Sequence, residues 1–110
     1  MRIWDLPPKK LCREHLLGEH RELHAIWSIL TKWKKGYSRH PETLRWKGKL
    51  KALYLRHDLL VHEMIRRSYR HKTPLDKQLS KGNAVQNLFV NTKREQVQIL
   101  KKKKCDCLLN

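Results

Sequence analysis

The sequence predicts an all-α, compact single domain in which three main helices follow a short extended N-terminal segment. Apolar residues recur at three- and four-residue spacing over long stretches, which is the period of an amphipathic helix. No stretch shows the strict alternation of a strand, and no internal repeat is visible. Since 110 residues suffice for one modest core, we assign residues 1–110 to one domain.

The N-terminal segment is expected over residues 1–8, ending at Pro7-Pro8. Pro7 biases Leu6 toward extended geometry, and Pro8 suits a first helical turn. The first helix should then run over about residues 9–35, closed by Lys34-Lys35-Gly36, since cations in the last turn and a following glycine are typical of a helix end. Its apolar face is set by spacing and comprises Cys12, Leu16, Leu23, Ile26, Trp27 and Leu30.

The second helix is expected over about residues 43–69. Its start could instead be near Gly48, because Trp46-Lys47-Gly48-Lys49 can break the first turn. Its predicted apolar face comprises Leu50, Leu53, Tyr54, Val61, Met64 and Ile65. The third helix is expected over about residues 93–103, where Thr92 and Glu95 have the spacing of a capping box. Between these helices, residues 84–90 should form a short helical or extended piece that packs Val85, Leu88 and Phe89.

The charge points to a polyanionic partner. The chain carries 26 Lys and Arg against 10 Asp and Glu, a formal +16, spread evenly along its length. Nucleic acid is the ordinary partner of such a domain, with a ribosome or an anionic membrane surface as alternatives. Exposed aromatics can stack bases, but we expect Trp27 in the core and favour core packing for Trp4, Trp33 and Trp46. No segment is long and apolar enough to span a membrane.

Residues 15–24 concentrate the polar chemistry of the first helix. Helical spacing places His15, Gly18 and Glu22 on one strip. A glycine inside a helix costs about 1 kcal/mol relative to alanine, so Gly18 needs a reason. We expect it to open a notch in which another group approaches Glu22 closely.

Two further patterns concern metals and thiols. His20 and His24 are four residues apart, which suits zinc, but Arg21 follows His20 where the zinc-protease pattern has glutamate. Solvated or phosphate-facing histidines are therefore favoured. Cys105-Asp106-Cys107 supplies at most two ligands and follows a lysine run that favours thiolate. An odd number of cysteines argues against a secreted disulfide framework, so an intracellular protein is expected. With nucleic acid as its partner, we expect it to be cytoplasmic and nucleoid-associated.

One resemblance gives these features a context. Met1-Arg2-Ile3 with Leu6, His15-Leu16, and Glu19 followed by Arg21-Glu22-Leu23 resemble the opening of the pyrimidine-dimer DNA glycosylases of the phage endonuclease V type. The match is ordered and ungapped over residues 1–23, weaker over 48–69 and slight after Pro74. Bacterial proteins assigned to this family look more similar to the chain than the phage enzyme does.

The resemblance implies a three-helix glycosylase and abasic-site lyase whose N-terminal α-amine forms a Schiff base with the damaged nucleotide. By position it implies Met1 as the nucleophile, where the phage enzymes have threonine, and Glu22 as the acid/base. Arg2, His15 and Arg21 match family residues at the DNA interface, and we add His20, Lys49 and Arg56 as phosphate contacts. The expected partner is damaged double-stranded DNA, bound by a monomer without cofactor or metal.

Two alternatives stay open. A non-catalytic, basic nucleic-acid-binding protein of the same fold would explain the charge without using Glu22. A metal- or thiol-dependent protein would use His20 and His24, or Cys105 and Cys107. Within the enzyme hypothesis, another lesion or abasic-site cleavage alone is also possible, because the chain has no counterpart of the aromatic C-terminal segment that contacts DNA in the phage enzyme.

Overall fold

The computed structural model describes residues 2–32, 36, 38–70, 73–103 and 105–108. Their order is η1 (Pro8–Lys10), α1 (Arg13–Lys32), α2 (Pro41–Leu44), α3 (Leu50–Arg66), η2 (Lys77–Leu79) and α4 (Lys93–Lys102). These residues form no strand, only an isolated antiparallel bridge between Lys49 and Gly82. The all-α prediction is confirmed. No helix in the described part of the chain has the length and apolarity to cross a membrane.

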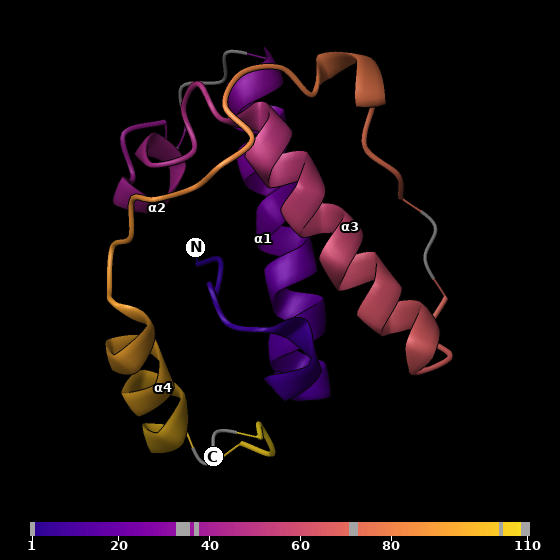
Figure 1. Ribbon diagram of the computed structural model, residues 1–110, viewed down its shortest axis with the longest axis vertical. Helices are drawn as coiled ribbons and strands as arrows, with labels where there is room; N and C mark the ends of the chain where they lie inside the picture. The colour runs from indigo at the N-terminus through magenta and orange to yellow at the C-terminus, as the bar shows by residue number, and fades with distance from the viewer. Residues whose placement is uncertain (1, 33–35, 37, 71–72, 104, 109–110) are drawn as a thin grey trace.

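Helices α1 and α3 pack along one another and supply most of the core (Figure 1). Burying each large apolar side chain contributes about 1.5–3 kcal/mol, so this face dominates the stability of the fold. The predicted face of α1 is confirmed, with Leu30 only partly buried. The buried side chains along the contact are Leu16, Leu23, Ile26 and Trp27 of α1, and Leu53, Leu60 and Met64 of α3.

The N-terminal segment runs between α1 and α4 (Figure 1), with Ile3, Trp4 and Leu6 buried. It also holds α4 in place. The Asp5 backbone N–H donates to Gln96 Oε1 at 2.7 Å, and Gln96 Nε2 donates back to Asp5 Oδ2 at 3.0 Å. Because Gln96 is buried on α4, this reciprocal pair fixes the helix to the start of the chain.

The capping box predicted for the last helix is confirmed. Thr92 Oγ1 accepts from the Glu95 backbone N–H at 3.1 Å, and Glu95 Oε1 accepts from the Thr92 N–H at 2.8 Å. Two of the N–H groups that have no partner within the helix are thereby satisfied.

Two helix starts differ from the sequence-based bounds. Helix α1 begins at Arg13, because Pro8–Lys10 forms a separate 3₁₀ turn. The carbonyl of Leu11, the residue after this turn, accepts from Arg67 Nη2 at 2.6 Å. The predicted second helix is divided into α2 and α3 at the expected interruption, where Gly48 has a φ of +74°. The predicted end of the first helix at Lys34 and Lys35 lies outside the described residues.

The prediction that residues 84–90 pack their apolar side chains was wrong. Val85 is 63% exposed, and Leu88 and Phe89 are also exposed. Polar contacts fix this segment along the surface, because Gln86 Nε2 donates to the Arg45 carbonyl at 2.8 Å and Arg45 Nη1 donates to the Leu88 carbonyl at 2.8 Å. For the tryptophans, core packing is confirmed at Trp4, Trp27 and Trp46, whereas Trp33 lies outside the described residues.

Candidate active site

A pocket of about 200 Å³ lies between the N-terminal segment and the first turns of α1. The strip predicted from helical spacing faces this pocket, since His15, Gly18 and Glu22 all line it. The remaining lining side chains are Arg2, Trp4, Glu14 and Glu19. Three carboxylates and the side chain of Arg2 therefore meet at one concave surface.

Gly18 forms an open part of the pocket wall. A Cβ added there would have Arg21 Nη2 as its nearest non-neighbouring atom, at 4.0 Å. The fold thus does not require glycine at this position for packing. Since Gly18 lines the pocket, as Glu22 does, a side chain there would take up part of the pocket's volume.

Glu19 holds the N-terminal segment against α1. Its Oε1 accepts from the Trp4 backbone N–H at 3.0 Å, and Arg56 donates to both of its oxygens at 2.7 and 3.1 Å. The carboxylate is buried, and burial raises the pKa of Glu19 although Arg56 opposes the rise. We infer that Glu19 is a positioning group, because its oxygens are committed to the partners that place Trp4.

His15 stands at the junction of the pocket and the C-terminal segment. Its ring meets Trp4 edge-on with centroids 5.8 Å apart, and its Nδ1 lies 3.0 Å from Cys12 Sγ and 3.4 Å from Cys107 Sγ. Burial, followed by the positive charge of Lys103, lowers the pKa of His15. A neutral ring is the form that such an environment favours.

The other expected DNA contacts are distributed differently. Arg2 donates to Asn91 Oδ1 at 2.9 Å at the pocket, and Arg21 is exposed on α1. Lys49 Nζ donates to Gln86 Oε1 at 2.8 Å. His20 is buried, and the guanidinium of Arg56 is in the ion pair with Glu19, so neither presents an open surface to a phosphate. The expected nucleophile, Met1, lies outside the described residues, but Arg2 next to it lines the pocket.

Sequence reasoning missed two groupings of potential metal ligands. Ligand atoms of Cys12, His15, Cys105 and Cys107 lie within 4.8 Å of one another, as do those of His20, His24 and His57. The pairs His20/His24 and Cys105/Cys107 were visible in the sequence. Their partners were not, because Cys12, His15 and His57 approach them only through the fold.

A larger pocket, of about 530 Å³, is lined by Lys9, Lys10, Glu63, Arg66 and Leu108. Its carboxylate accepts hydrogen bonds from Arg66 and Arg67, and is therefore committed to ion pairs. We place the candidate chemistry at the smaller pocket, where Glu22 and Arg2 both line the wall.

Fold and site together define a small, basic helical domain with a carboxylate-lined pocket beside its own N-terminal segment. A protein-family model described as pyrimidine dimer DNA glycosylase matches residues 1–77. The chain belongs to this family. The match ends well before α4, so the C-terminal third is outside it. Neither the curated proteins nor the solved structures gave a match.

Proposed function

We propose that this protein is a DNA glycosylase and abasic-site lyase that acts on pyrimidine dimers through the α-amine of Met1, with Glu22 as acid/base. The observation that carries the proposal is the pocket in which Glu22 and Gly18 of α1 adjoin Arg2. Family membership over residues 1–77 supports the substrate class.

The α-amine suits the reaction because its ordinary pKa is about 7.7–8.0, so a usable fraction is neutral at physiological pH. Its nitrogen lone pair attacks C1′ of the damaged nucleotide, and the bond from C1′ to the base breaks, with its electron pair leaving on the base. Loss of the amine protons and protonation of the ring oxygen then open the sugar to a Schiff base. Removal of a C2′ proton expels the 3′ phosphate by β-elimination, which cuts the strand.

Among the three carboxylates that line the pocket, Glu22 is the one we assign to proton transfer. Glu19 accepts from Arg56 and Trp4, and Glu14 is exposed near the start of α1. Glu22 is half-buried, one helical turn from Gly18, and its carboxylate would stabilise the positive charge that develops on the sugar. Proton transfer by a positioned side chain typically contributes about 10²–10⁴-fold.

Access to the damaged nucleotide requires a distorted duplex. Extruding a nucleotide costs a few kcal/mol, which phosphate contacts offset. We propose that Arg2, His15 and Arg21 contribute on the DNA side, Arg2 and His15 from the pocket wall and Arg21 from the exposed face of α1.

The decisive experiment is borohydride trapping on duplexes that contain an abasic site or a pyrimidine dimer. A covalent protein–DNA adduct is expected, because reduction of the Schiff base makes the link permanent. Adding one glycine before Met1 should abolish trapping while DNA binding persists. Salt-sensitive binding without any adduct would instead support the non-catalytic alternative.

Glu22→Gln should reduce strand cleavage by about 10²-fold or more, since it removes the group that moves protons. The matched control is Glu14→Gln, at the exposed edge of the same pocket, which should stay within a few-fold of wild type. Single-turnover cleavage of an abasic duplex gives both rates. Equal losses in the two variants would contradict the assignment of Glu22.

A further inference from the structure

We propose a structural zinc site that attaches the C-terminal segment to the start of α1, with four ligands: Cys12, His15, Cys105 and Cys107. The site departs from the expectation of a protein without metal, and it goes beyond the glycosylase function. Three thiolates and one imidazole are a donor set that structural zinc sites use.

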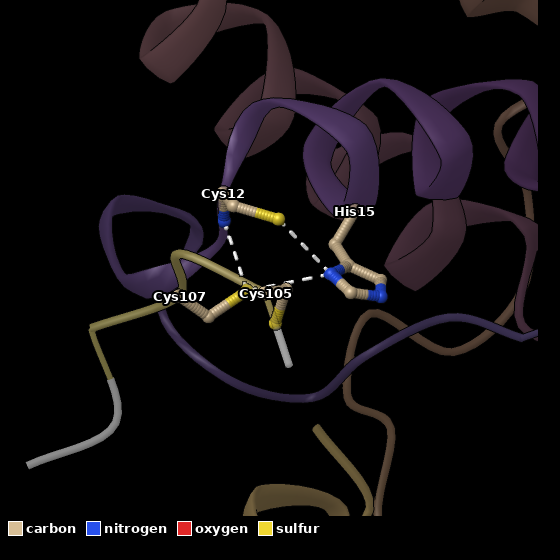
Figure 2. Close-up of side chains that lie close together, drawn as sticks. All are labelled: Cys12, His15, Cys105 and Cys107. Atoms are coloured by element: carbon tan, nitrogen blue, oxygen red, sulfur yellow. Dashed lines mark hydrogen bonds between the residues drawn. The ribbon is translucent and has the colours of Figure 1, made fainter. Parts of the chain in front are cut away.

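The four ligand atoms converge at the scale of a coordination sphere (Figure 2), all within 4.8 Å of one another. His15 Nδ1 lies 3.0 Å from Cys12 Sγ and 3.4 Å from Cys107 Sγ. With Zn–S near 2.3 Å and Zn–N near 2.0–2.1 Å, ligand atoms of a tetrahedral site are roughly 3.5–3.8 Å apart. An ion therefore fits with only small side-chain adjustments.

The backbone keeps the two halves of the site in register. Cys12 and His15 are three residues apart at the start of α1, so they share one face. On the other side, the Leu108 N–H donates to the Lys10 carbonyl at 2.7 Å, which places the segment that carries Cys105 and Cys107. The Cys12 N–H also donates to Cys107 Sγ at 3.0 Å. In a metal site, an N–H donor of this kind orients the ligating sulfur.

The charge balance and the redox state agree with zinc. All three cysteines are free thiols, and one disulfide among them would leave the third unused. Three thiolates, a neutral imidazole and Zn²⁺ carry a net charge of −1. Lys103, just after α4, offsets that charge, since its positive charge acts on His15.

The site joins the family core to a segment outside it, because the family match ends at residue 77. A zinc ion at this site would also fix the tautomer of His15, which lines the pocket. With Nδ1 bound to zinc, the proton of the His15 ring must be on Nε2, which points away from the thiols (Figure 2). His15 would then present a fixed N–H donor, and this last point rests on the proposed function.

The test measures metal rather than activity. Full-length protein produced with zinc, then desalted through a weak chelator, should retain zinc. The double variant Cys105→Ser/Cys107→Ser should contain one equivalent of zinc less than wild type. The control is Asp106→Asn, at an exposed position between the two cysteines, and its zinc content should match wild type. Replacing zinc by Co²⁺ should give thiolate-to-cobalt charge-transfer absorption in the wild type and none in the double variant.

The cobalt spectrum of the wild type decides the case even if the double variant does not fold. If the wild type shows no thiolate-to-cobalt absorption, the proposal is overturned. It is also overturned if a folded double variant matches the wild type in both zinc content and charge-transfer absorption. Failure of borohydride trapping would refute the proposed glycosylase mechanism and leave the metal result unaffected.

A second, independent observation points to another zinc ion, between α1 and α3. The Nε2 atoms of His20, His24 and His57 form a triangle with every side 3.2 Å. Three imidazole nitrogens around a tetrahedral zinc ion are roughly 3.3–3.4 Å apart. His20 and His57 are buried, whereas Arg21, which stands where the zinc-protease pattern has glutamate, is exposed.

At most two of the three contacts in this triangle can be hydrogen bonds, and His24 Nε2 also lies 3.4 Å from Thr73 Oγ1. Each Nε2 either carries a proton or presents a lone pair, so among three such atoms at least two are in the same state. The two atoms of that pair are not hydrogen-bonded to each other, although they lie 3.2 Å apart. A central cation would instead be bound by all three lone pairs at once.

This site has its own matched variants. His57→Gln should contain one zinc equivalent less than wild type and keep the thiolate-to-cobalt absorption. His62→Gln, on the exposed side of the same helix, should lose no zinc. His24→Gln, at the half-buried edge of the triangle, serves if His57→Gln fails to fold. Wild-type protein with no more zinc than the folded histidine variants would overturn the second site.

Discussion

Gly18 is the residue at which stability and activity should separate. Gly18→Ala should raise the free energy of unfolding by about 0.5–1 kcal/mol, because alanine loses less backbone entropy and the added Cβ has room. Cleavage of an abasic duplex should fall about tenfold or more, since the methyl group intrudes where the sugar must approach.

The control for this prediction is Ala25→Gly, on the exposed side of the same helix. It should lower the stability by a similar amount and leave cleavage unchanged. Urea unfolding and single-turnover cleavage measure the two effects. A Gly18→Ala variant with full activity would show that the notch is not used by the substrate.

Glu63 should make stability depend on pH. The hydrogen bond from Arg66, opposed by burial and reinforced by Arg67, lowers the pKa of Glu63 from 4.5 to about 2. Because the folded pKa lies below the unfolded one, its contribution is complete above pH 4.5 and is lost as the pH falls toward 2.

Glu63→Gln should therefore lower the free energy of unfolding at pH 7 by about 1.5–3 kcal/mol, the range for hydrogen bonds to charged groups. The difference from wild type should shrink as the pH falls through that window. Urea unfolding with a chelator present at each pH isolates this effect from metal loss. A difference independent of pH would contradict the ion-pair explanation.

Among the elements, the loop between α2 and α3 depends on two glycines in close contact. Gly82 has a φ of +91°, and a Cβ on it would lie 2.3 Å from the Gly48 carbonyl oxygen. That same oxygen accepts from the Asn83 N–H at 3.0 Å, so the two segments cannot separate without losing a hydrogen bond.

Gly82→Ala should accordingly cost about 2–4 kcal/mol, from backbone strain together with the clash. Gly48→Ala is the matched control: its φ of +74° is also strained, but its Cβ would meet nothing within 4 Å. We expect it to cost only about 1–2 kcal/mol. Thermal or urea unfolding compares the two, and equal losses would exclude the close approach as the cause.

The N-terminal segment acts as an element although it has no regular secondary structure. Arg45, only 5% exposed, binds Glu42, Asp5 and the carbonyl oxygen of Ile3. With the Asp5–Gln96 pair and the bond from Trp4 to Glu19, these contacts hold residues 3–5 between helices. The proposed mechanism would need this support, because its nucleophile at the N-terminus must stay in position.

At the scale of the whole molecule, the excess of positive charge should control DNA affinity. Counterion release makes log K fall linearly with log salt, with a slope of about −0.9 per phosphate contact. Arg21→Gln should reduce the magnitude of that slope by about 1 and weaken binding to damaged and undamaged duplexes alike. Fluorescence anisotropy from low to moderate salt measures this. An unchanged slope would place Arg21 away from the phosphates.

The sequence by itself determined the features that depend on neighbours along the chain. Helical periodicity predicted the buried face of α1, the pair Thr92 and Glu95 predicted the capping box, and spacing placed Gly18 and Glu22 on one strip. Each rests on backbone geometry within a few residues, which short stretches of sequence encode directly. The resemblance of residues 1–23 also indicated the family whose model matches residues 1–77.

Only the tertiary structure decided which distant side chains meet. Arg56 was expected to contact DNA, but in the fold it donates to Glu19, which is 37 residues away along the chain. His57 meets His20 across the same separation. Cys107 reaches His15 across 92 residues. Local propensity carries no information about such pairs, because burial and the packing of α3 and the C-terminal segment against α1 bring them together. Thus both proposed zinc sites, unlike the pocket strip, depend on long-range packing.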